Sequence, residues 1–188
     1  MKAVRILATL MIVSGVPARL GFAQERPARA AASQSPPAAG APAPRPEDAK
    51  IRKSYVVPAL DILGFDLMLN RYDYHFVDKQ VYGVTFASVK RNLTHTWIVD
   101  TDPFAVNQFY HPYQGSIYFG AARSAGLHYL GALGYTFAGS LLWEIAGETG
   151  PPSINDQITT GFGGTLLGEP LFRIASLLLE HGHGAPRL

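Results

Sequence analysis

The sequence predicts an all-α fold, a compact, membrane-associated bundle of four to five helices whose Gly-rich central helices pack closely. Apolar residues recur at helical spacing in the stretch 58–72, where Leu60, Leu63, Leu67 and Met68 form one stripe. Residues 116–148 contain no proline and many small side chains, which favours a long helix that others approach closely. Only 16% of the residues are charged, below the roughly 25% of ordinary soluble domains.

The first 50 residues indicate an export signal followed by a linker. Residues 1–23 combine Lys2 and Arg5 with an apolar run and end in small residues, the pattern of a secretory signal peptide. The apolar run is shorter than the about 20 residues that span a membrane, although an uncleaved N-terminal anchor is an alternative. Residues 24–50 are rich in Ala and Pro and are expected to be a disordered linker. The helical domain then covers residues 51–182, and a frayed tail covers residues 183–188.

The composition excludes several classes of protein. The chain has no cysteine, which rules out a disulfide scaffold, an iron–sulfur cluster, a thiolate zinc site and a cysteine nucleophile. The formal net charge is +2 and the basic residues form no patch, so no nucleic acid partner is expected.

Helix start and stop signals divide the folded part. Asp102 before Pro103 is a typical N-cap, and the short helix that it begins is expected to end before Pro112. Ser153 and Asp156 form a capping-box pattern that predicts a helix from residue 154 to about residue 167.

Other segments are less regular in sequence. Pro170 is expected to break or kink the helix before a last one that ends near residue 180. Gly161, Gly163 and Gly164 weaken the helix in which they lie, unless close helix contact requires them. Residues 81–93 fit neither helical nor strand spacing clearly, and an irregular segment or a short strand is expected there.

Residues 124–143 carry no formal charge. A helix of 20 residues is about 30 Å long, the thickness of a hydrocarbon core. The pairs Ala121/Ala125 and Ala122/Gly126 place small residues four apart, which would let another helix approach. We therefore expect a membrane-embedded or membrane-facing helix here, with a buried helix of a soluble bundle as the alternative.

Polar residues recur at helical spacing on these apolar helices, and they could converge on one polar centre. The candidates for this centre are Asp100, Asp102, Asn107, His111, Arg123, Ser140, Glu144, Glu148, Asn155, Asp156, Glu169 and Arg173.

Three interpretations of this centre stay open. The first is a structural network, in which Arg123 and Arg173 pair with Glu144, Glu148 and Glu169 and fix the register of the helices. Such pairing would satisfy charges that burial otherwise makes costly.

The other two interpretations are chemical. A metal site would draw on His111, Glu144, Glu148, Asp156 or Glu169, which suit a hard or borderline ion. Di-iron bundles carry a Glu-x-x-His motif on each of two helices, and the sequence has no such pair, so no metal ligand is assigned from sequence. A hydrolytic site would use His111 as general base, but neither Gly-x-Ser-x-Gly nor His-Glu-x-x-His occurs.

Longer ordered motifs carry a family resemblance. The run from Trp97 to Ser116 reads W-x-x-D-x-D-x-F-x-x-N-Q-x-x-H-P-Y-x-G-S, and the motifs A-R-S-x-G, G-S-x-x-W-E-x-x-x-E, P-S-I-N-D and G-E-x-x-x-R follow it. Together with Asn70-Arg71-Tyr72 and Asn92-Leu93, these motifs resemble the bacterial envelope family catalogued as domain of unknown function 3943, over residues 55–180. The resemblance implies a secreted or membrane-associated bacterial protein and supplies no reaction. The polar residues that recur in the family fall on the candidates named above, except Ser140.

The sequence thus leads us to expect an uncharacterised protein of the bacterial cell envelope, exported and held in or against a membrane. Its role is expected to be structural or interactive rather than catalytic, with membrane lipid and an envelope protein as partners. A membrane-associated hydrolase or metalloenzyme acting on a lipid or cell-wall substrate is the alternative, and a soluble periplasmic binding module is a third hypothesis. No cofactor is indicated.

Overall fold

A computed structural model describes residues 53–182 of the chain. The predicted signal peptide, the linker at residues 24–50 and the tail at residues 183–188 lie outside the described residues. The described part is 78% helical and forms six continuous helical runs and no strand, which confirms the all-α prediction. The count exceeds the expected four to five because residues 79–94 form two short helices instead of an irregular segment or strand.

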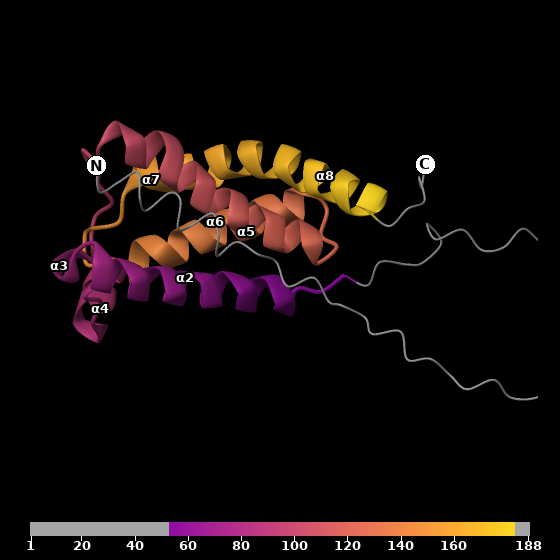
Figure 1. Ribbon diagram of the computed structural model, residues 1–188. Helices are drawn as coiled ribbons and strands as arrows, with labels where there is room; N and C mark the ends of the chain where they lie inside the picture. The colour runs from indigo at the N-terminus through magenta and orange to yellow at the C-terminus, as the bar shows by residue number, and fades with distance from the viewer. Residues whose placement is uncertain (1–52, 183–188) are drawn as a thin grey trace, which may run out of the picture. The chain divides into compact units, whose positions relative to one another are not determined.

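Four long helices make the bundle. The elements in chain order are α2 (Val56–Phe76), α3 (Lys79–Tyr82), α4 (Phe86–Thr94), the π-helical turn η2 (Val106–Tyr110), α5 (His111–Ser124), α6 (Tyr129–Ala146), α7 (Ile154–Ile158), the π-helical turn η3 (Thr159–Gly163) and α8 (Gly164–Gly182). In Figure 1, α5 and α6 lie between α2 and α8, and successive long helices run in opposite directions. The loops that follow α2 and α6 and the start of α5 therefore meet at one end of the bundle.

The closest helix contact joins α5 to the start of α8. A Cβ atom on Gly115 would overlap the carbonyl oxygen of Thr160 and lie 2.9 Å from Cα of Gly164. Only glycine fits on both sides, so the two backbones touch. This contact confirms close packing of Gly-rich helices, and it explains why Gly164 is present in a helix that it weakens. The small-residue pairs predicted at residues 121–126 do not make this contact.

The predicted long helix from residue 116 to residue 148 is wrong, because the chain turns at residues 125–128. Gly126 has a φ of 83°, its N–H donates to the carbonyl oxygen of Arg123, and the N–H of Leu127 donates to that of Ala122. These bonds form a Schellman motif, which ends α5. The uncharged residues 124–143 therefore cover a turn and most of α6 rather than one straight span.

Two prolines lie within continuous helices, although Pro112 was predicted to end its helix and Pro170 to break or kink its own. Pro112 lies just after the π-helical turn η2 and has no backbone N–H to donate. The wider spacing of the π-helical turn accommodates this missing donor, so residues 104–124 form one continuous helix. Pro170 lies inside α8, and residues 154–182 form one helical run through η3. Because π-helical turns often occur at functional sites, their positions beside His111 and Asp156 are relevant to the site.

The bundle carries its apolar side chains outward. In α2, Leu60 and Leu67 are 61% and 60% exposed, whereas Asp66 and Asn70 are each 6% exposed. The same arrangement holds along α8, where Leu178 is 68% exposed. The predicted apolar stripe of α2 thus faces away from the neighbouring helices.

One helical run of the described part, Ile154–Leu179, is long and apolar enough to cross a membrane by length and composition. Only 17% of its most apolar window is buried, which distinguishes it from the core helix of a soluble protein.

Candidate functional site

Most of the predicted polar residues gather where α5 begins, α6 ends and α7 begins. We call this group the polar cluster; its members are Asp100, Asp102, Asn107, His111, Glu144, Glu148, Asn155 and Asp156. Ser140 lies one helical turn before Glu144 in α6, is 1% exposed, and its hydroxyl has no hydrogen-bond partner among the described residues.

A short backbone pairing brings the loop before η2 to the start of α7. The N–H of Ile98 donates to the carbonyl oxygen of Pro152 at 3.0 Å, and the N–H of Ile154 donates to that of Ile98 at 2.8 Å. Asp100 lies two residues after Ile98 in this loop, so the pairing places its carboxylate beside Asn155.

Asn155 connects the members of the polar cluster. Its Nδ2 donates to Oδ1 of Asp100 at 2.7 Å and to oxygens of Asn107 and Asp156 at 3.2 Å each. Its Oδ1 accepts the N–H of Asp100 at 3.0 Å and the hydroxyl of Ser153 at 2.8 Å. One side-chain amide thus fixes carboxylates and amides from separate parts of the chain.

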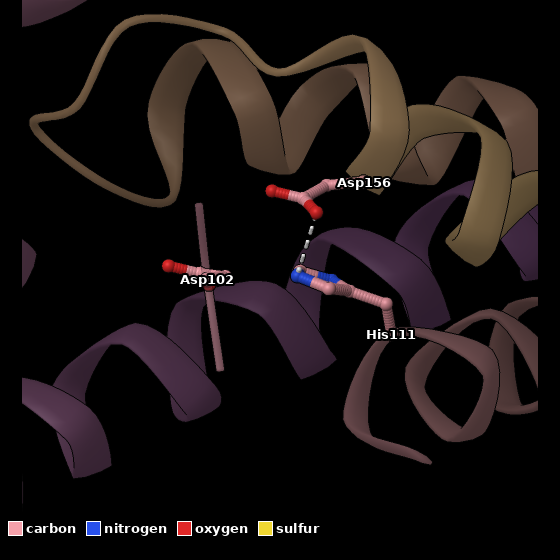
Figure 2. Close-up of side chains that lie close together, drawn as sticks. All are labelled: Asp102, His111 and Asp156. Carbon is pink, nitrogen blue, oxygen red and sulfur yellow. Dashed lines mark ion pairs between the residues drawn. The ribbon is translucent and has the colours of Figure 1, made fainter. Parts of the chain in front are cut away.

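His111 and Asp156 face each other across the polar cluster (Figure 2). Nε2 of His111 lies 3.4 Å from Oδ1 of Asp156, and both side chains are buried. Neither ring nitrogen of His111 has a hydrogen-bond partner among the described residues. Asp102 lies beside them, so that one ligand atom from each of the three residues is within 4.8 Å of the other two. Asp102 is exposed and does not cap the helix as predicted, which leaves its carboxylate available to the cluster.

Glu144 accepts a backbone hydrogen bond at the start of α7 that the capping-box prediction assigned to Asp156. Ser153 is the N-cap, and its hydroxyl accepts the N–H of Asp156 at 3.3 Å, as predicted. The N–H of Ser153, however, donates to Oε2 of Glu144 at 2.8 Å. Because Glu144 takes this donor, Asp156 faces His111 rather than its own N-cap.

Carboxyl groups are crowded in the polar cluster, and burial shifts their pKa values. Burial raises the pKa of Asp102, and the charge of Asp100 raises it further. Burial raises the pKa of Glu148 to about 7, with added repulsion from Asp102 and Asp100. Burial also acts to raise the pKa of Asp100, but hydrogen bonds from Asp156, Asn155 and the backbone of Asp102 outweigh it and lower that pKa. Within residues 53–182, no lysine or arginine forms an ion pair with these carboxylates.

Arg123, Glu169 and Arg173 form a separate group. Nε of Arg123 donates to Oε2 of Glu169 at 3.0 Å, and Nη2 of Arg173 lies 2.7 Å from Oε1 of the same carboxylate. His111 begins α5 and Arg123 lies 12 residues later, about 18 Å along the helix axis. The arginines therefore do not pair with Glu144 or Glu148 as the predicted network required.

Sequence analysis missed a polar face on α2. Asp66, Asn70 and Asp73 are all buried and recur at intervals of four and three residues, a spacing that could have revealed them. Asp66 accepts a hydrogen bond from the hydroxyl of Tyr118, which accepts one from Gln114 at 2.6 Å. These contacts lie on α2 and α5 within the bundle.

Asn70 and Asn92 have a defined structural role, since both bind the C-terminal end of α6. Nδ2 of Asn70 donates to the carbonyl oxygen of Gly147 at 2.7 Å, and that of Asn92 donates to the carbonyl oxygen of Glu148 at 3.3 Å. Carbonyl groups that end a helix need such donors when they are buried.

Comparison with known proteins identifies a family. Residues 96–187 match the model of the family described as Domain of unknown function (DUF3943), which confirms the resemblance. The polar cluster and the group around Glu169 lie inside the matched range, whereas Asn70 and Asn92 lie before it. No curated protein and no solved structure matches the chain.

Proposed function

We propose that this chain, whose residues 96–187 match the DUF3943 family model, is a bacterial cell-envelope protein with a helical domain embedded in a membrane. Its apolar helix faces would contact lipid, and the polar cluster would hold the helix ends together from inside. In this proposal residues 1–23 export the chain, and its role in the envelope is structural or interactive.

The observation that carries the proposal is the reversed distribution of polarity. Large apolar residues are exposed on three of the four long helices, such as Leu60 on α2, Leu141 on α6 and Leu166 on α8, and Phe109 is exposed in η2. Buried positions instead include many polar side chains, such as Glu144, which is 1% exposed. Soluble monomers rarely expose apolar patches beyond a few hundred Å², whereas lipid is a suitable neighbour for them.

Helix length supports the same proposal. With 21 residues, α2 is about 31 Å long, close to the thickness of a hydrocarbon core. The run Ile154–Leu179 is also long enough to cross.

Alkaline carbonate extraction tests the proposal. The full chain would be expressed in a bacterium, its envelopes isolated and washed with carbonate, and the protein followed by immunoblot. We expect a processed form that stays in the pellet, as an embedded domain does. Release of the protein into the supernatant would contradict membrane embedding, and N-terminal sequencing of the pelleted form tests the export signal separately.

A hydrolase that uses His111 as general base is supported less well. A general base must lie within hydrogen-bond reach of the proton that it accepts, and a third group usually orients its ring. Neither nitrogen of His111 has such a partner among the described residues. The unpartnered ring among carboxylates points to a different ligand.

A further inference from the structure

We propose that Asp102, His111 and Asp156 bind one divalent transition-metal cation, with Zn²⁺ as the best match. The three side chains come from the loop before η2, the start of α5 and α7. This site does not depend on whether the domain is embedded in a membrane.

The geometry of His111 and Asp156 fits metal ligation better than a hydrogen bond. Their facing atoms, Nε2 and Oδ1, are 3.4 Å apart, beyond the usual length of a hydrogen bond. Two atoms that bind one zinc ion at about 2.0–2.1 Å lie about 3.3 Å apart in tetrahedral coordination. The observed separation is therefore the one expected for neighbouring ligands of a single ion.

Asp102 supplies the third ligand. One of its oxygens lies within 4.8 Å of the ligand atoms of both other residues. Because Asp102 is exposed, rotation of its side chain can shorten that distance without disturbing the packed helices. The same exposure gives the ion a path from solvent to the two buried ligands.

The buried imidazole is the second, independent observation. His111 is 8% exposed, and both of its ring nitrogens lack a hydrogen-bond partner among the described residues. Buried polar groups in native proteins are nearly always satisfied, so an unpartnered ring that faces two carboxylates needs an explanation. A cation between the ring and the carboxylates provides one.

The surroundings favour a positive ion. Asp100, Glu144 and Glu148 lie close by, and no lysine or arginine within residues 53–182 pairs with any carboxylate of the polar cluster. Asn155 donates to Asp156 and to Asp100, which is the kind of outer hydrogen bond that orients metal ligands.

The donor set also limits the kind of ion. One imidazole nitrogen with two carboxylate oxygens suits borderline cations such as Zn²⁺ and Mn²⁺, whereas soft cations prefer sulfur. The chain has no cysteine. Three protein ligands leave a coordination position for water, as in zinc sites that exchange ligands.

Zinc titration of the purified full chain tests the site. The protein would be stripped with a chelator and titrated calorimetrically with Zn²⁺, and bound metal would be counted by mass spectrometry. We expect one ion per chain, and we expect His111→Gln and Asp102→Asn each to weaken binding at least tenfold, since even outer-shell changes cost about 10- to 100-fold. His75→Gln and Asp61→Asn, which change exposed residues of α2, are matched controls and should leave the affinity unchanged.

Two results would overturn the proposal. One is wild-type protein that takes up less than about a tenth of an equivalent of Zn²⁺ under conditions that load structural zinc sites. The other is an unchanged Kd in Asp102→Asn; because Asp102 is exposed, this variant is informative even if His111→Gln does not fold. Circular dichroism of each variant shows which of them retain the fold.

Discussion

The backbone N–H of Ser153 donates to Oε2 of Glu144 at 2.8 Å, and this bond closes the end of α6 against the start of α7. Glu144 is 1% exposed and has no arginine partner among the described residues. Its buried carboxylate therefore acts as an acceptor for the backbone rather than as half of an ion pair.

This relationship predicts different effects for two substitutions of Glu144. Gln keeps an oxygen that accepts from Ser153, so Glu144→Gln should change the free energy of unfolding by less than about 1 kcal/mol. Glu144→Ala strands a buried N–H and leaves a cavity, which should cost about 2–4 kcal/mol. Thermal unfolding of both variants in detergent checks this difference. An equally large loss in Glu144→Gln would indicate a charge partner that the described residues do not contain.

The contact of Gly115 with Gly164 predicts that α5 tolerates alanine at one glycine and not at another. Gly115→Ala would force a methyl group into the backbone of Thr160 and Gly164, at an expected cost of about 1–3 kcal/mol. Gly120 lies in the same helix with nothing within 4 Å of its Cβ position, so Gly120→Ala should stabilise the helix by up to about 1 kcal/mol. Opposite shifts in Tm are the expected result, and equal shifts would contradict the close contact.

A substitution at Asn70 can remove a buried hydrogen-bond donor without changing the size of the side chain. Its Nδ2 donates to the carbonyl oxygens of Gly147 and Tyr82 at 2.7 and 2.9 Å. Asn70→Asp replaces this donor by an oxygen that faces both carbonyl groups, which should reduce the free energy of unfolding by about 2–3 kcal/mol. Asp61→Asn, an exposed change on the same helix, should have little effect. Chemical unfolding of the two variants makes the comparison.

Glu148 predicts a pH dependence of stability. Burial raises its pKa from the usual value of 4.5 to about 7 in the folded protein. The folded state thus retains a proton that the unfolded state has lost, and stability falls as pH rises from about 4.5 to about 7. Glu148→Gln should remove only the share of this decline that Glu148 contributes, because burial also raises the pKa values of Glu144 and Asp66. The variant should exceed the wild type by up to about 3 kcal/mol at pH 8, measured without metal. Parallel curves for the two proteins would contradict the raised pKa.

Sequence patterns predicted the features that depend on residues within one helical turn of each other. Ser153 caps α7 as its spacing indicated, and the glycines at residues 161–164 do serve helix contact at Gly164. The helix end predicted before Pro112 was wrong because it considered only the missing N–H of proline. A π-helical turn such as η2, directly before His111, accommodates that missing donor and is not visible in the sequence. The turn at Gly126 was hidden by its apolar neighbours, which fit a helix equally well.

The candidate site was predictable in its composition and only partly in its arrangement. Helical spacing singled out His111, Glu144 and Asp156, which the fold does bring together. Helical spacing shows which residues share a face but not how far apart they lie along the bundle axis. It therefore could not show that Arg123 lies at the opposite end of α5 from His111. The buried face of α2 was missed because the apolar stripe of a helix normally faces the core, whereas the stripe of α2 faces outward.

Accessibility of spin labels on α8 tests the central claim most directly. The chain lacks cysteine, so Leu171→Cys and Leu178→Cys each provide a unique labelling site on the exposed face of α8. Thr165→Cys, at a buried position of the same helix, is the control for packing. In liposomes, we expect labels at the two leucine positions to collide with dissolved oxygen far more than with a water-soluble nickel complex. Ready collision with the nickel complex at both positions would show that this face lies in water and would contradict the membrane-embedded domain.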